Sequence, residues 1–462
     1  MINAPADRSI IFIENREKTR LWEGVATRLQ DRGWNVHWIV QNPCFRPSRG
    51  TLHELRNLRT GNELSESDIA AQFPLLTHER GRKYFASGCA HYLPAFKEIT
   101  AIIQQVRPIA VVGEPTLFHE LLAVQACSDL GVPYLHPAGE RYLSDRFTVL
   151  SGATQTPIMK TRHRLARDEA MKLSRKIAAR TRRPLYMKKL TRLSVFQRRA
   201  RWIWTRAAIW YGRQIGEQFN TPSALTKHRL ERCGRSLRRR WAELSTGADL
   251  EGAILYPLQM QPEANIDVWG HPFSDQTEMI RRLAEAAPSR TRIAVKANPK
   301  WKYEVDDGLL ELIANNPQVI AIPEDTTMAD VQARVLGAVT VSGTIGLEAL
   351  FGLGSCISLR HPLLTEKFPS FAAGDPAEAV QKLLRDPASA CGNEELGAAY
   401  LQHQYEHSFP GYLLDPFNWP FVLGEDNLEP IATGVEVVLS QINDADGEDR
   451  AQARLAMRPE QS

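Results

Sequence analysis

Short apolar runs alternate with longer amphipathic segments along the first half of the chain. Apolar runs of about four to eight residues beside turns are typical of buried strands, whereas apolar positions about three to four residues apart are typical of helices. The pattern predicts strands at 9–15, 34–40, 109–113 and 132–136, with helices at 16–33, 92–106 and 117–131. Strands separated by helices imply a parallel sheet covered on both faces.

The same alternation returns from residue 252. It predicts strands at 252–259, 291–299 and 319–324, followed by a strand, turn, short helix and second strand within 338–359, and helices at 273–287, 306–316, 326–337 and 377–386. The fold class predicted is therefore α/β, with two similar alternating halves.

The segment between the halves has a different character. Residues 160–206 carry 17 Lys and Arg but only two acidic residues, Asp168 and Glu169, and glycine and proline are scarce. We expect a basic helical insertion or linker at 151–250. It divides an N-terminal domain at 1–150 from a C-terminal domain at 251–442, which a flexible tail at 443–462 follows.

Composition limits the class of protein. Hydrophobic residues make up 43% of the chain and charged residues 24%, which is ordinary for a globular protein. The six cysteines lie far apart without a C-x-x-C pair, a pattern typical of reduced, buried thiols. Neither a signal peptide nor an apolar run of about 20 residues is evident. We therefore expect a cytoplasmic protein, or one attached to a membrane from its surface.

Polar residues follow three predicted strands of the second half. Ser342, Gly343 and Thr344 end one strand and open a short helix that carries Glu348. Glycine permits a sharp turn, Thr344 is expected to cap the helix, and free N–H groups at a helix start attract a phosphate. Gln259 and Glu263 follow a second strand and Asn298 a third. The alternative is that the turn only caps a helix and that the other two segments are solvated loops.

These motifs resemble the capsule polysaccharide biosynthesis and related surface-carbohydrate glycosyltransferases of the GT-B type. The resemblance covers roughly 252–365 and is carried by Tyr-Pro-Leu-Gln with a following Pro-Glu (256–263), Asp-Gln (275–276), Val-Lys-x-x-Pro (295–299) and Ser-Gly-Thr-x-Gly-Leu-Glu-Ala (342–349). Weaker support comes from 111–122 and 137–142 in the first half.

The resemblance implies two Rossmann-like domains facing across a cleft, with the acceptor on the first and a nucleotide-sugar donor on the second. It implies no bound metal, because enzymes of the GT-B type need none, and no cofactor, because the nucleotide-sugar is a substrate. By matching position, Ser342, Gly343 and Thr344 would hold the donor phosphates and Glu348 the donor hydroxyls. The remaining donor-binding residues it implies are Gln259, Glu263, Lys296 and Asn298. Asn298 and Gln259 are departures, because the family commonly carries histidine at both positions.

Candidates for catalysis come from the first half. Glu114 follows the strand at 109–113, and Glu140 precedes Arg141, which is suited to an anionic acceptor group. An alternative role for Glu114 is to stabilise the helix at 117–131 through its dipole. Three histidines, His119, His136 and His271, are isolated in sequence and are interpreted as structural. The H-E-x-x-H motif and Cys/His clusters with metal-binding spacing are lacking.

The basic segment predicts a further partner. Basic residues beside Trp202 and Trp210 favour an anionic membrane surface, and no known nucleic-acid motif accompanies them. A solvated connector is the alternative. We predict a glycosyltransferase acting on a lipid-linked or polysaccharide acceptor, peripheral at the inner face of the cytoplasmic membrane. The alternatives are a non-catalytic assembly protein and a nucleotide-sugar epimerase of the same architecture.

Overall fold

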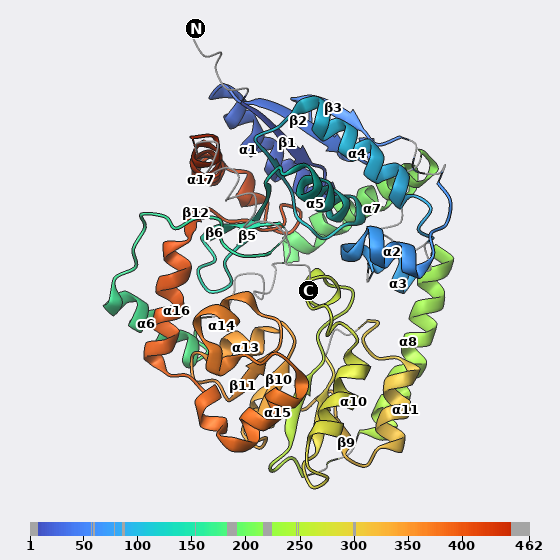
Figure 1. The fold of residues 1–462 in the computed structure, drawn as a ribbon, viewed down its shortest axis with the longest axis vertical. Coiled ribbons are helices and arrows are strands. Elements are labelled where there is room, and N and C mark those ends of the chain that lie inside the picture. Colours follow the sequence, from blue (N-terminus) through green and yellow to red (C-terminus); the bar gives the residue numbers. More distant parts are fainter. Residues whose placement is uncertain are drawn as a thin grey trace.

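The computed structural model describes residues 8–444 except 57, 59–60, 78, 86–87, 153, 183–191, 216–223, 246, 248 and 299–301. It has two α/β units, each built on one sheet, and the predicted fold class is confirmed (Figure 1). The tail predicted at 443–462 lies almost entirely outside the described residues.

The first sheet has seven strands in the order β12-β6-β5-β4-β1-β2-β3. Its strands are β1 (Ser9–Ile13), β2 (Asn35–Val40), β3 (Thr51–Glu54), β4 (Ala110–Val112), β5 (Tyr134–Gly139), β6 (Arg146–Ser151) and β12 (Ser408–Pro410). The five strands from β5 to β3 are parallel, whereas β6 and β12 are antiparallel to their neighbours.

Alternating residues of β1 separate the two cores of this unit. Ile10 and Phe12 pack toward α1 (Thr19–Asp31) and α17 (Glu425–Asp444). Ile11 and Ile13 pack on the opposite face of the sheet with α4 and α5. The helices on that face are α2 (Glu66–Gln72), α3 (Arg80–Phe85), α4 (Tyr92–Val106) and α5 (Phe118–Leu130). Burial on both faces is what a parallel sheet requires.

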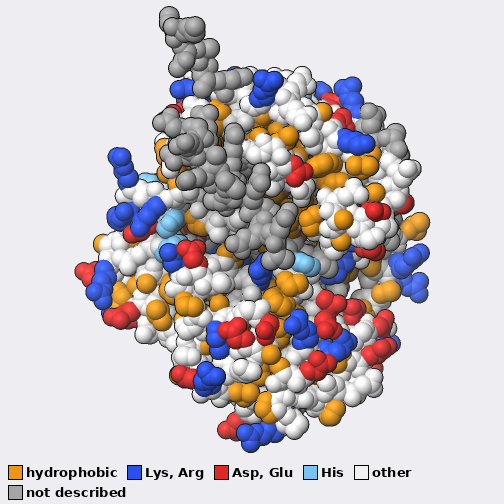
Figure 2. All heavy atoms as spheres, viewed as in Figure 1, with side chains coloured by type: hydrophobic (Ala, Val, Ile, Leu, Met, Phe, Trp, Pro, Cys, Tyr) orange, Lys and Arg blue, Asp and Glu red, His pale blue; other side chains and the backbone are white. Residues whose placement is uncertain are grey.

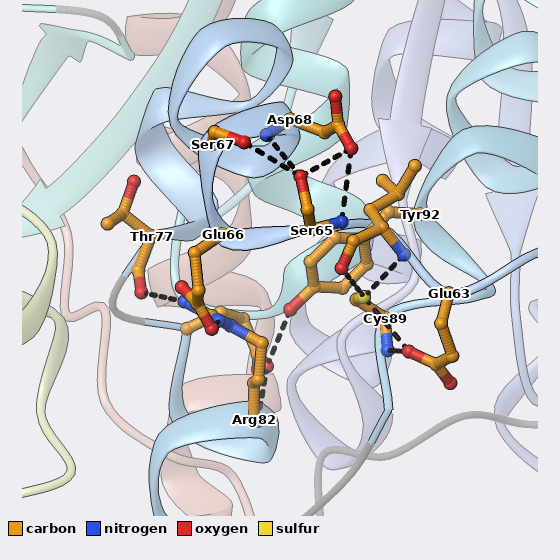
Figure 3. A network of polar contacts seen from close by, with 11 residues as sticks. Glu63, Ser65, Glu66, Ser67, Asp68, Thr77, Arg82, Cys89 and Tyr92 are labelled. Atoms are coloured by element: carbon orange, nitrogen blue, oxygen red, sulfur yellow. Dashed lines mark hydrogen bonds and ion pairs between the residues drawn. The ribbon is translucent and has the colours of Figure 1, made fainter.

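A polar network holds the segment between β3 and α4 (Figure 3). Ser65 and Asp68 form a capping box at the start of α2, and the Cys89 thiol donates to Glu63 at 3.0 Å. Arg82 on α3 donates to Glu66 and to the backbone carbonyl of Thr77. These contacts fix α3 against the first unit.

The second sheet has five parallel strands in the order β11-β10-β7-β8-β9. Its strands are β7 (Ile254–Pro257), β8 (Ile293–Lys296), β9 (Val319–Ile322), β10 (Gly337–Thr340) and β11 (Cys356–Ser358). The helices among and after them are α9 (Ala264–Asp267), α10 (Gln276–Ala286), α11 (Asp307–Asn315), α12 (Met328–Gln332), α13 (Thr344–Ala349), α14 (Pro362–Lys367) and α15 (Pro376–Arg385). Each element predicted in this half is present, but the helix predicted at 326–337 covers only α12, and the strand predicted at 291–299 covers only β8.

The basic middle segment is divided between the units. Its helices are α6 (Arg167–Ala178), α7 (Arg192–Ile215) and α8 (Ala224–Leu244). α6 packs against α16 (Glu394–Glu406), α7 lies on the first unit, and α8 runs along the second unit beside α11 (Figure 1). Trp241 of α8 is fully buried there and donates to the Ile322 carbonyl at 3.2 Å. Within the described part of the chain, no helix is long and apolar enough to cross a membrane.

The end of the chain returns to the first unit, which corrects the predicted C-terminal boundary at 442. Ser408 of β12 pairs with Thr148 of β6, and α17 packs on α1. Arg32, directly after α1, pairs with Glu436 of α17 at 2.7 Å. Hydrophobic periodicity identifies a helix but not the sheet it covers, so the sequence pattern placed these residues in the wrong unit.

The described residues include all six cysteines. All six cysteines are free, but only Cys89, Cys127 and Cys356 are buried as expected; Cys44 and Cys391 are partly buried and Cys233 is exposed. Acidic and basic side chains are interspersed over the second unit on the face seen in Figure 2. This face offers no large field of one sign.

Candidate active site

A cleft of about 1110 Å³ lies between the two units and is lined by both. The first unit contributes residues of β5 and the turn after it, including His136, Glu140 and Arg141. The second contributes residues that follow β7, β10 and β11. Ligands of parallel α/β sheets bind beyond the carboxyl ends of the strands, where these residues lie. The predicted cleft is therefore present.

The junction after β10 forms part of the cleft wall. Gly343 precedes α13, and its N–H donates to Thr340 Oγ1 at 3.1 Å. A Cβ at Gly343 would lie 2.5 Å from that oxygen, so the close approach requires glycine. α13 begins at Thr344 and has no side-chain cap. The prediction that Thr344 caps this helix was wrong, because its hydroxyl accepts a hydrogen bond from Arg141 instead.

Gln259 holds this junction in place. Its Oε1 accepts from the Ser342 N–H at 3.0 Å, and its Nε2 donates to Ser342 Oγ at 3.1 Å. Ser342 Oγ in turn donates to the Asn265 carbonyl at 2.8 Å. Gln276 fixes the backbone of Gln259 through two hydrogen bonds of 2.8 Å. Both ends of the Gln259 amide are therefore engaged in positioning the loop.

Arg141 crosses from the first unit to the second. Its Nη1 donates to Thr344 Oγ1, and its charge acts on the carboxyl groups of Glu263 and Glu348. Burial raises the pKa of both carboxyls, and Arg141 opposes that rise. Arg180 also acts on Glu348. The cleft thus brings guanidinium groups and partly desolvated carboxyls together beside the 342–344 loop.

Glu140 is the most perturbed carboxyl of the cleft lining. Its Oε1 accepts from the Thr148 hydroxyl at 2.5 Å and its Oε2 from Gln404 Nε2 at 2.5 Å. Burial raises its pKa to about 7, although the Thr148 hydrogen bond and the charges of Arg146 and Arg141 oppose the rise. A carboxyl of this kind exchanges a proton near neutral pH.

One wall of the cleft was missed by the sequence analysis. It is formed by α16 and the turn after it, and its lining residues are Tyr400, His403, Gln404 and His407. Their spacing in the sequence places these residues on one face of a helix, but no local feature of the sequence indicated that this face meets the cleft. His361 after β11, Lys18 before α1 and Arg180 after α6 also line the cleft and were not predicted.

Two predicted site residues do not line the cleft. Lys296 is buried, and its Nζ donates to the carbonyls of Pro323 and Glu324 at 3.3 and 3.2 Å. Glu114 accepts from Lys18 Nζ at 2.5 Å, and of this pair it is Lys18 that lines the cleft. Glu120, rather than Glu114, caps α5 by accepting from the N–H groups of Thr116 and Leu117.

The other predicted residues all line the cleft: Gln259, Glu263, Asn298, Ser342, Gly343, Thr344, Glu348, Glu140 and Arg141. Pro299 and Lys300, which belong to the motif around Asn298, lie outside the described residues. No group of three or more His, Cys, Asp or Glu side chains suited to a metal ion occurs in the part of the chain that the structure describes.

The units also meet through α3. The Tyr84 hydroxyl donates to Asp267 Oδ1 at 2.7 Å, and Lys83 Nζ lies 3.6 Å from the same oxygen. The Tyr84 ring stacks on Tyr303 with centroids 5.4 Å apart. Arg141 and Tyr84 therefore join the two units through separate sets of contacts.

Comparison with known proteins supports the resemblance seen in the sequence. Residues 233–358 match the model of a family described as capsule polysaccharide biosynthesis protein. This segment holds β7–β10, the 342–344 loop and α13. The predicted resemblance is confirmed over this part of the chain. No curated protein matches the chain.

Several solved structures are similar to this chain, with low sequence identity and low TM-scores. The Thermosulfurimonas dismutans KpsC β-Kdo 2,7 transferase is 12% identical over 69% of this chain and 84% of its own, with a TM-score of 0.32. The KpsC β-Kdo 2,4 transferase of the same organism is 15% identical over 69% and 88%, with a TM-score of 0.30. The UDP-GlcNAc 2-epimerase of Methanocaldococcus jannaschii, solved with UDP-GlcNAc and UDP, is 14% identical over 86% and 98%, with a TM-score of 0.26.

Proposed function

We propose that this protein is a glycosyltransferase of bacterial capsule or other surface polysaccharide biosynthesis that uses a nucleotide-sugar donor. The observation that carries the proposal is the Arg141–Thr344 contact across the cleft, beside a loop that belongs to the segment matching the capsule family. It places a cation from the opposite unit at the first residue of α13, an arrangement suited to a phosphate.

In this proposal the second unit binds the donor. Ser342, Gly343 and Thr344 face the phosphates, with Gln259 fixing the shape of their loop. Glu348 and Glu263 accept hydrogen bonds from sugar or ribose hydroxyls, and Asn298 contributes an amide to the same wall. Lys296 acts indirectly, by holding the chain after β9.

The first unit binds the acceptor and takes part in the chemistry. The departing nucleotide phosphate gains negative charge, which Arg141 and Arg180 stabilise, so we propose that the reaction needs no metal. The position of Glu140 on the cleft supports its contact with substrate. Glu114 acts through Lys18, whose ammonium group it pairs.

We also propose that the protein attaches to the inner face of the cytoplasmic membrane through α7. Trp202, Ile203 and Trp210 of this helix are 52%, 61% and 65% exposed, whereas Ala208 and Ile209 are buried against Phe45. Arg206 lies 5.2 Å from the Trp202 ring centroid. Interfacial aromatics beside cations suit an anionic lipid surface, where a lipid-linked acceptor would be found.

Donor binding tests the proposal. A thermal-shift series with UDP-, GDP- and CMP-sugars should give a rise in melting temperature with at least one nucleotide, because a ligand that binds only the folded state stabilises it. A rise that is lost in Arg141→Ala would place the ligand in the cleft. No shift with any of the nucleotides would favour a non-catalytic assembly protein.

A further inference from the structure

His136 presents an oriented imidazole to the cleft. It lies on β5, lines the cleft, and its Nδ1 is 2.8 Å from Gln155 Oε1. Gln155 Nε2 donates to the carbonyls of Ser151 and Gly152 at 3.2 and 3.0 Å, which fixes the amide with its oxygen toward the ring. A carbonyl oxygen can only accept, so Nδ1 carries the proton of the neutral imidazole.

The other ring nitrogen is consequently a free acceptor. In the Nδ1–H tautomer, His136 Nε2 holds a lone pair, and it has no hydrogen-bond partner among the described residues. It is also absent from the buried polar atoms of the described chain that lack a partner. The lone pair therefore faces open space, and the space beside this residue is the cleft.

The residue that orients the ring is held in an uncommon backbone conformation. Gln155 has a φ of +58°, in the left-handed region that residues other than glycine seldom occupy. The turn is closed by hydrogen bonds from Gln155 N to the Ser151 carbonyl at 2.9 Å and from Ser151 N to the Thr156 carbonyl at 2.8 Å. Such conformations persist where surrounding contacts enforce them, and they are frequent near functional sites.

The two carboxyls predicted to be catalytic are less suited to accept a proton from an acceptor. Each oxygen of Glu140 already accepts one hydrogen bond, and its pKa of about 7 leaves much of it protonated near neutral pH. Glu114 is paired with Lys18. Burial lowers the pKa of His136 below its usual value, which favours the neutral ring.

We propose that His136 is the general base of the transfer reaction, taking the acceptor proton on Nε2, with Gln155 as its positioning residue. This inference rests on the proposed function. In the step, the acceptor O–H bond breaks and its proton passes to Nε2. The acceptor oxygen bonds to the anomeric carbon, and the bond from that carbon to the phosphate breaks, its electron pair leaving with the nucleotide. The proton then passes from His136 to water, and the single displacement inverts the anomeric centre.

The charged groups facing His136 define its pH dependence. Glu114, after β4, raises its pKa, and Lys18, before α1, lowers it, while burial is the largest cause of the net lowering. The base is active when neutral. Turnover should therefore fall as the pH is lowered below about 6.5, the usual pKa of histidine, because His136 then becomes protonated.

The test measures nucleotide release from UDP-GlcNAc, UDP-glucose, GDP-mannose and CMP-sialic acid, with water and with p-nitrophenyl glycosides as acceptors. His136→Asn should lower kcat by about 10²- to 10⁴-fold, the usual contribution of a general base, with little change in donor KM. It should also remove the acid limb of the pH profile. His53→Asn is the matched control, because His53 bonds His37 at the far edge of the sheet, and it should behave as wild type.

Gln155→Glu separates positioning from packing. Its carboxylate still accepts from Nδ1 and adds a negative charge, so the acid limb should move to higher pH while turnover remains. If wild type releases nucleotide and His136→Asn releases it at the same rate, the inference about His136 is overturned while the proposed function stands. An acid limb of the pH profile that persists in His136→Asn would have the same consequence. Release by wild type from none of the four donors would contradict the proposed function and the inference with it.

Discussion

Arg141 of the first unit donates a hydrogen bond to Thr344 Oγ1 of the second, joining residues that are 203 positions apart in the chain. The guanidinium reaches the first residue of α13, beside the loop that Gln259 holds through Ser342. A ligand bound at this loop therefore meets groups from both units. Binding and the relative placement of the units are expected to be coupled through this contact.

Thr344→Val should weaken donor use without unfolding the protein. Valine keeps the shape of threonine but removes the acceptor of Arg141, which costs about 1 kcal/mol in the free energy of unfolding. We expect kcat/KM for the donor to fall about tenfold, equivalent to about 1.4 kcal/mol of transition-state stabilisation.

Thr433→Val on α17 is the matched control for this substitution. Thr433 also accepts from an arginine, Arg32, at 3.1 Å, but on the surface of the first unit. It should change stability slightly and leave donor kinetics unchanged. Equal kinetics for Thr344→Val and Thr433→Val, measured by steady-state nucleotide release, would remove Thr344 from the donor site.

Glu348→Gln should impair donor binding specifically. Glu348 lines the cleft, and the charges of Arg180 and Arg141 act on its carboxyl group. An amide in its place keeps the size of the side chain but loses the charge and one hydrogen-bond acceptor. We expect donor Kd to rise about tenfold by titration calorimetry. Glu378 lies on α15 and pairs with Lys382. Its variant Glu378→Gln should bind donor as wild type does. An unchanged Kd in Glu348→Gln would contradict its role.

Glu140 should give a measurable pH dependence of stability. Its folded pKa of about 7 lies above the value of about 4.3 for an unfolded glutamate. The folded chain therefore binds this proton more tightly. The stabilisation that Glu140 gives to the folded state is complete below about pH 4 and is lost as the pH rises through 7. Between about pH 5 and 8 the loss is about 2 kcal/mol in the free energy of unfolding.

Urea unfolding of wild type and Glu140→Gln at the two pH values isolates this contribution. Other buried acids, including Glu120 with a pKa of about 8, add to the slope of both proteins, so the difference between them is the quantity of interest. Glu140→Gln should lose about 2 kcal/mol less than wild type over this range. Parallel pH dependences would show that Glu140 is not the titrating group.

The outward face of α7 should bind anionic lipid. Cosedimentation with liposomes containing phosphatidylglycerol is expected to decrease as salt rises, because exposed charges are screened within about 8 Å at physiological ionic strength. Trp202→Ala with Trp210→Ala should remove the part that persists at high salt. Leu384→Ala on α15, also an exposed apolar residue, is the control and should bind as wild type. Equal binding to neutral and anionic liposomes would return α7 to the role of a connector.

The local pattern of the sequence predicted the two sheets and the family resemblance implied the cleft, but neither gave the direction of every side chain. Lys296 and Asn298 are two positions apart at the end of β8, where side chains are expected to point to the same side, yet only Asn298 lines the cleft. Lys296 instead donates to carbonyls beyond β9. In α7, packing on Phe45 buries Ile209, whereas Trp202 and Trp210 of the same helix are exposed. Such outcomes depend on contacts between segments distant in the chain.

The histidine that the sequence left as structural shows the same limit. His136 has no partner nearby in sequence, and its orientation depends on Gln155 in a turn beyond the next strand. Gln259 is the reverse case. Gln259 departs from the family's usual histidine, but its amide supplies the donor and the acceptor that bind Ser342.

Product analysis tests the central claim most directly. The protein would be incubated with each of the four nucleotide-sugars, with and without an acceptor, and the sugar products identified by NMR. Our account predicts a glycoside that forms only with acceptor, together with release of one nucleotide per glycosidic bond. Conversion of a donor to its epimer without acceptor, or no product under any condition, would contradict it.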